Sequence, residues 1–142
     1  MMFFDKSCSS LFLFAVAISG LGAAAQAQPA MIGEALFQEN CAVCHGAAGA
    51  GDGPVADLFA QKPRNLQLLA KENNGAFPFS ETYQAIDGTR QIGAHGNSEM
   101  PVWGDLFAEE ANPHTFHPGI DTREIVQGRI LSLVYYLQTV QQ

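Results

Sequence analysis

The chain has 142 residues, enough for one domain at most, and its formal net charge is −7 at pH 7. This acidity argues against nucleic acid and anionic membranes as partners, because both carry negative charge themselves. It permits a protein partner that offers a basic docking surface.

The first segment of the chain predicts a secretory signal peptide over residues 1–27. Lys6 precedes a short apolar run over residues 11–18, and Ala25 and Ala27 form a small-x-small cleavage site. The run is shorter than the roughly 20 apolar residues that a bilayer-spanning helix needs. This length favours cleavage over the alternative, an uncleaved amino-terminal anchor.

Cleavage would leave a domain over residues 28–142, which we expect in the periplasm without a membrane span. Cys8 lies before the apolar run and would leave with the signal peptide. Cys41 and Cys44 would then be the only cysteines in an oxidising compartment. The pattern requires no more than a monomer.

The stretch Cys41-Ala42-Val43-Cys44-His45 matches C-x-x-C-H, the attachment sequence of a c-type haem. Two thiols at this spacing reach the two vinyl groups of one porphyrin, and the adjoining imidazole comes under the iron as an axial ligand. A zinc site would need two further ligands nearby, and a thioredoxin-like redox pair would need a βαβ context. Because the sequence offers neither, the motif predicts one haem c attached covalently through Cys41 and Cys44, with His45 bound to the iron.

A helix is predicted over residues 33–44, because its apolar and haem-facing residues recur three and four positions apart. Gly33 weakens this helix, and either a close approach by another helix or a frayed helix start would explain its presence. The glycine-rich loop over residues 45–54 would fold closely around His45. An iron-bound histidine usually donates its second ring N–H to a carbonyl, and Pro54 is the candidate acceptor. An ordinary loop proline is the alternative interpretation.

A cationic stretch around Arg64 suggests a contact with a haem propionate, since the guanidinium is a fork-shaped donor. A solvated turn is the alternative interpretation. Short helices are expected over residues 66–71 and 80–86. Ser80 would be the N-cap of the second helix, and Gly88 would lie just past its end.

Met100 lies in a loop flanked by glycine and proline, where it is hard to explain as a core residue. A thioether is a soft ligand that suits haem iron and raises its reduction potential. Met100 is therefore the predicted second iron ligand beside His45, and His95 is the rival. Trp103 is expected to pack beside the porphyrin, with its N–H toward a propionate or a carbonyl.

Residues 105–119 form an acidic and aromatic segment that predicts an irregular surface loop. His114 and His117 within it are three positions apart. Without a firm third ligand they are weak evidence for a zinc site.

The last helix is predicted to begin after Asp121, which has the spacing of a capping box with Glu124. We expect this helix to cross the helix over residues 33–44, with Phe37 and Tyr136 at the crossing. Its apolar stripe consists of Ile125, Val126, Ile130, Leu133, Val134, Leu137 and Val140.

Over about residues 33–141 the chain resembles the class I (monohaem) cytochrome c family. Residues 41–45 match its haem site, Met100 with Pro101 matches its distal ligand, and residues 133–137 match the aromatic stretch of its last helix. The stretch over residues 95–104 looks like a bacterial periplasmic branch of that family.

The resemblance implies an all-α, small cytochrome c fold. It has four to five short helices around one covalent haem, with crossing N- and C-terminal helices. It also implies iron ligation by His45 and Met100, and one-electron transfer. Residues 105–119 depart from the family, because this segment is longer than the compact family core needs.

The sequence therefore predicts an electron carrier rather than an enzyme, since it shows no acid–base or nucleophile constellation. The expected partners are redox proteins: an oxidase, a reductase or a dehydrogenase. The alternatives are an electron-accepting cytochrome subunit of a periplasmic dehydrogenase, an open-site haem enzyme, and a sensor of a small gas.

Overall fold

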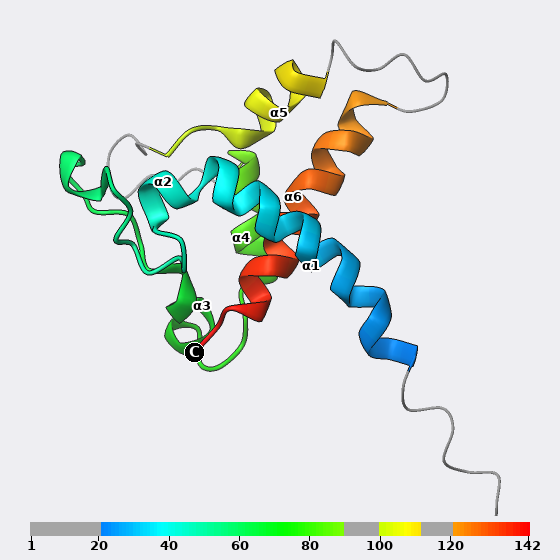
Figure 1. Cartoon of the computed structure of the whole chain (residues 1–142), viewed down its shortest axis with the longest axis horizontal. Helices are drawn as coiled ribbons and strands as arrows, with labels where there is room; N and C mark the ends of the chain where they lie inside the picture. The colour runs from blue at the N-terminus through cyan, green and yellow to red at the C-terminus, as the bar shows by residue number, and fades with distance from the viewer. Residues whose placement is uncertain (1–20, 90–99, 112–120) are drawn as a thin grey trace, which may run out of the picture.

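The computed structural model describes residues 21–89, 100–111 and 121–142, and within these ranges it consists of helices and loops without a strand (Figure 1). This confirms the all-α fold. The elements are α1 (Leu21–Asn40), α2 (Ala42–His45), the 3₁₀ turns η1 (Ala56–Leu58) and η2 (Leu66–Leu68), α3 (Leu69–Glu72), α4 (Phe79–Asp87), α5 (Trp103–Ala111) and α6 (Thr122–Thr139).

The two longest helices, α1 and α6, cross at the centre of the fold (Figure 1). A Cβ atom added to Gly33 of α1 would lie 1.9 Å from the carbonyl oxygen of Ser132 and 2.8 Å from the Cβ of Tyr136. The rings of Phe37 and Tyr136 pack beside this point, with their centroids 5.3 Å apart. The predicted crossing is confirmed, and Gly33 is the residue that lets the two backbones touch.

The hydrophobic core surrounds this crossing, and α6 supplies most of it. Helices α4 and α5 pack onto α6, and each contributes one large buried side chain to the core cluster, Ile86 and Phe107. Burying a side chain of this size contributes about 1.5–3 kcal/mol. The cluster contains Phe37, Ile86, Phe107, Val126, Ile130, Leu133, Val134, Tyr136 and Leu137.

The predicted helix over residues 33–44 is in fact two helices, which is a correction. Helix α1 ends at Asn40, and Cys41 interrupts the run with φ −110° and ψ −33° before α2 begins. Helix α1 also starts earlier than expected, at Leu21, and contains Pro29. No helix of the described residues is both long enough and apolar enough to cross a membrane.

The start of α4 also differs from the prediction. Ser80 is not the N-cap, because the helix begins at Phe79 with Pro78 in the cap position. The hydroxyl of Thr82 donates a hydrogen bond of 2.7 Å to the carbonyl of Pro78, which closes the first turn one residue earlier. The other end is as predicted: Gly88 follows the helix with φ +86° and donates its N–H to the carbonyl of Gln84.

Part of the expected surface loop over residues 105–119 is helical, which is a third correction. Trp103, Phe107 and Ala111 are four positions apart, so they lie on one face of α5. The Phe107 ring is fully buried and lies 5.4 Å from the guanidinium carbon of Arg129. Acidic residues between these positions made the apolar stripe hard to recognise in the sequence. The remainder of the segment, with both of its histidines, lies outside the described residues.

Both ends of α6 are fixed by side chains. The predicted N-cap is confirmed, since the Asp121 carboxylate accepts a 3.0 Å hydrogen bond from the N–H of Arg123. At the other end, the Gln141 amide donates to the carbonyl of Leu66 at 2.8 Å and accepts from the N–H of Ala70 at 2.8 Å. The end of the chain is therefore tied to the segment that forms η2 and α3.

We expect Gly33→Ala to lower the free energy of unfolding by about 1–3 kcal/mol, because the new methyl group would overlap the backbone of α6. Urea denaturation followed by circular dichroism would measure the change. Gly128→Ala is the matched control, because it lies within α6 with nothing inside 4 Å of an added Cβ. The control should gain about 1 kcal/mol from helix propensity, and equal stabilities for the two variants would contradict the tight crossing.

Candidate functional site

The cysteine motif lies in one tight turn at the end of α1. The N–H of Cys41 donates to the carbonyl of Phe37 at 2.8 Å, and the N–H groups of Cys44 and His45 donate to the Cys41 carbonyl at 3.1 and 2.9 Å. The two thiols are free and half-buried. Burial, with a smaller contribution from Cys44, raises the pKa of Cys41 to about 12.

The ring of His45 is oriented by a backbone carbonyl. Its Nδ1 lies 3.0 Å from the carbonyl oxygen of Arg64. A carbonyl can only accept, so Nδ1 carries the hydrogen and donates it, which leaves Nε2 as the nitrogen free to bind a metal. Burial lowers the pKa of His45, partly offset by this hydrogen bond, and so favours the neutral imidazole that ligates iron.

The prediction that the Pro54 carbonyl accepts the hydrogen bond from His45 is wrong, because the Arg64 carbonyl accepts it. The residues on either side of Pro54 bond to the backbone of α2, because Gly53 donates to the carbonyl of Cys44 and Val55 donates to that of Val43. The chain then continues through η1, and Arg64 is the residue that comes back into contact with His45. A bond between residues 19 positions apart gives no local sequence signal.

Gly51 packs directly against the peptide that carries the Arg64 carbonyl. Its φ is +84°, and an added Cβ would lie 2.5 Å from the carbonyl oxygen of Pro63 and 3.3 Å from the carbonyl carbon of Arg64. The N–H of Gly51 donates to the His45 carbonyl at 2.8 Å. The glycine-rich loop therefore does fold closely around His45, as its composition predicts.

The side chain of Arg64 points to a partner that the sequence did not suggest. Its Nε donates to Oε2 of Glu72 at 3.1 Å, and its Nη2 contacts the same oxygen. Both side chains are about half-exposed. The propionate contact stays a prediction, and it would require the guanidinium to leave Glu72 or to bridge both groups.

Met100 lies just before α5, half-buried against the core cluster, and Trp103 is the first residue of that helix. Two glycine contacts fix this part of the chain. An added Cβ on Gly88 would lie 2.4 Å from Val102, and one on Gly104 would lie 2.7 Å from the carbonyl oxygen of Asp87. Helix α5 therefore begins against the end of α4, with Met100 on the core side.

The ring of Trp103 lies 5.5 Å from that of Phe107 and packs on the core cluster. Its place beside a porphyrin remains a prediction, as does iron ligation by Met100. The rival ligand His95 lies outside the described residues.

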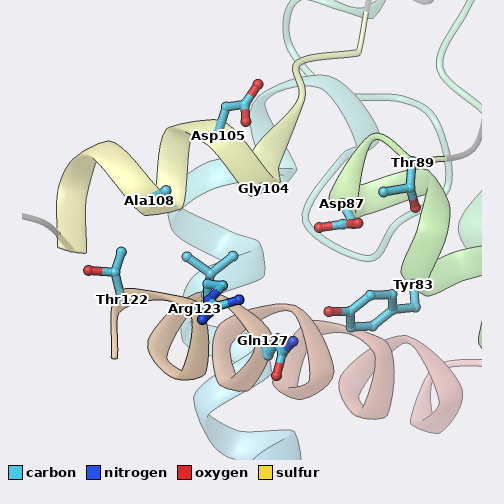
Figure 2. A pocket seen from close by; sticks show the side chains of 10 residues that line it. Tyr83, Asp87, Thr89, Gly104, Asp105, Ala108, Thr122, Arg123 and Gln127 are labelled. Carbon is cyan, nitrogen blue, oxygen red and sulfur yellow. The ribbon is translucent and has the colours of Figure 1, made fainter. Parts of the chain in front are cut away.

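A separate open pocket of about 500 Å³ lies between α4, α5 and the start of α6 (Figure 2). Among the described residues, its lining includes no cysteine, histidine or methionine and presents hydroxyl, carboxylate and amide groups. This donor set does not suit a haem, so the pocket is not the candidate haem site. Its lining consists of Tyr83, Asp87, Thr89, Gly104, Asp105, Ala108, Thr122, Arg123, Val126 and Gln127.

The residues around His45 fit a covalent haem. Two thiols and an imidazole with its Nδ1 already bonded lie on one turn, and a thioether lies on the core side of another segment. Soft sulfur and imidazole nitrogen are ligands that haem iron accepts. Within the described ranges no cluster of three or more His, Cys, Asp or Glu offers a competing metal site.

The helical fold and the C-x-x-C-H turn are those expected of a cytochrome c domain. A model of the family described as "Cytochrome C oxidase, cbb3-type, subunit III" matches residues 28–112, more than half of the chain. The chain therefore belongs to this family of cytochromes c, which implies covalently bound haem c and haem-based electron transfer. Neither the curated proteins nor the solved structures contain a match.

We expect Gly51→Ala to destabilise the protein more than Gly75→Ala does. Both glycines have φ near +85°, so each substitution places an alanine in the same strained backbone conformation. Gly75 has nothing within 4 Å of an added Cβ, whereas Gly51 contacts the peptide that orients His45.

Backbone strain should lower the free energy of unfolding by about 1–2 kcal/mol in both variants. The overlap in Gly51→Ala should lower it by about 1–3 kcal/mol more. Urea denaturation of the holoproteins would measure the difference. If the two variants have equal stability, Gly51 does not set the position of the Arg64 peptide.

Proposed function

We propose that the protein is a periplasmic electron carrier with one haem c, attached through Cys41 and Cys44 and ligated by His45 and Met100. The observation that carries the proposal is the hydrogen bond from Nδ1 of His45 to the Arg64 carbonyl. This bond fixes the tautomer and the ring plane of the proposed ligand. The haem, when bound, supplies one-electron redox chemistry.

The work of the protein in this proposal is to hold both ligands in place and to exclude water from the iron. The tight backbone packing of Gly51 on the Arg64 peptide holds His45. On the other side, the contact of Gly88 with Val102 holds the segment that carries Met100. Because both ligands come from fixed segments, little needs to move when an electron is gained or lost.

Electrons are proposed to pass at the edge that carries the thioethers. Val43, between the two cysteines, is 46% exposed, so this turn lies at the surface. Most cations of the described residues are already paired with carboxylates, which leaves the excess acidic groups to face a partner. The pairs are Lys62–Asp57, Arg64–Glu72, Arg123–Asp121 and Arg129–Glu110. A basic surface on an oxidase, reductase or dehydrogenase would complement this charge.

A second candidate is a subunit role, because the family description names a subunit of an oxidase. The domain would then remain bound to an oxidase, or to a periplasmic dehydrogenase, rather than diffuse between partners. Size-exclusion chromatography of a native extract separates the two roles. A carrier elutes near its own mass of about 15 kDa or less, whereas a subunit co-elutes with its complex.

The iron ligands are tested with the Met100→Ala variant. The wild type should be low-spin, with a thioether–iron charge-transfer band and no rapid binding of CO. The variant should lose the band, bind CO and have a lower reduction potential, because a thioether ligand raises the potential. Optical spectra and potentiometry measure these changes.

His95→Ala is the control for this experiment and should keep the band. If the wild type lacks the band, or if His95→Ala removes it, Met100 is not the ligand. Rapid CO binding by the wild type would favour an open-site enzyme or a gas sensor instead.

Export is tested by the mass of the protein recovered from the periplasm. We expect a chain that begins at Gln28 and contains 115 of the 142 residues, with the mass of one added haem. Intact-mass spectrometry measures both quantities. A haem-bearing chain that keeps residues 1–27 would show an uncleaved anchor.

A further inference from the structure

Two contacts connect the proposed iron ligand to an acidic side chain in another part of the fold. The first is the hydrogen bond from His45 Nδ1 to the Arg64 carbonyl, and the second is the ion pair between the Arg64 guanidinium and Glu72. One residue therefore makes both contacts, with its backbone and with its side chain. Arg64 therefore connects Glu72 to the ring of His45.

Glu72 is presented from a fixed position. It is the last residue of α3, whose N-terminal part is held by the amide of Gln141 from the end of α6. Between Arg64 and this helix, the Asn65 side chain accepts a 2.9 Å hydrogen bond from the N–H of Gln67 and fixes the turn. The carboxylate can therefore act as an anchor for Arg64.

We propose that Glu72 is a positioning residue for the iron ligand, and that it acts through Arg64 to hold the carbonyl that accepts from Nδ1 of His45. The proposal rests on the proposed role of His45 as a haem ligand. In this proposal the guanidinium of Arg64 binds Glu72 rather than a haem propionate.

Loss of the anchor should weaken the hydrogen bond of His45. A hydrogen bond from Nδ1 makes the imidazole a stronger donor to iron. A looser carbonyl would let the Nδ1 hydrogen exchange with solvent more quickly and would raise the reduction potential. Since the ion pair is half-exposed, the expected change in exchange rate is modest, about two- to fivefold.

The experiment compares Glu72→Gln with Asp57→Asn in the reduced holoprotein. Asp57 forms an exposed ion pair with Lys62, so its substitution also removes one negative charge and one surface pair. NMR would measure the exchange rate of the His45 Nδ1 hydrogen, and potentiometry would measure the reduction potential. The charge-swapped double variant Arg64→Glu with Glu72→Arg provides the rescue.

Faster exchange in Glu72→Gln, wild-type exchange in Asp57→Asn, and recovery in the double variant would support the proposal. Equal exchange rates in the two single variants would overturn it, whatever their potentials, because loss of charge alone would then explain any shift. If the wild type shows no iron-bound histidine ring, the proposed function fails as well. An iron-bound His45 with no response to Glu72→Gln removes the positioning role and leaves the proposed function intact.

Discussion

The fold depends on one backbone contact, the approach of α1 to α6 at Gly33. Any side chain at this position would overlap the carbonyl of Ser132 and hold the helices apart. Close contact lets the ring of Phe37 reach Tyr136, and the rest of the core assembles along α6. Because the cysteine motif follows directly from α1, the same contact also decides where Cys41 stands relative to the core.

Around the motif, the loops are held by three contacts that link His45, Gly51 and Arg64 to one another. His45 bonds to the Arg64 carbonyl, Gly51 packs on the Arg64 peptide, and Gly51 bonds back to the carbonyl of His45. Each contact constrains the other two, and together they hold the His45 ring at the end of α2. The Gln141 amide extends this order to the end of the chain.

The errors of sequence interpretation follow from the range of the interactions. Local rules correctly placed Gly88 past a helix and Asp121 at a cap, since both depend on a few neighbouring residues. They failed at Ser80, where the preceding proline and Thr82 closed the turn earlier. They also missed α5, where the acidic residues Asp105, Glu109 and Glu110 are interspersed with the apolar ones.

The sequence by itself determined the class of protein, because attachment of one haem requires two cysteines and a histidine at a fixed local spacing. It also determined the crossing helices, since only glycine at position 33 permits such close contact. Tertiary structure alone decided which carbonyl orients His45 and which carboxylate pairs with Arg64. Many loop residues offer a carbonyl or a charge, and only the path of the folded chain brings a particular one within hydrogen-bond distance.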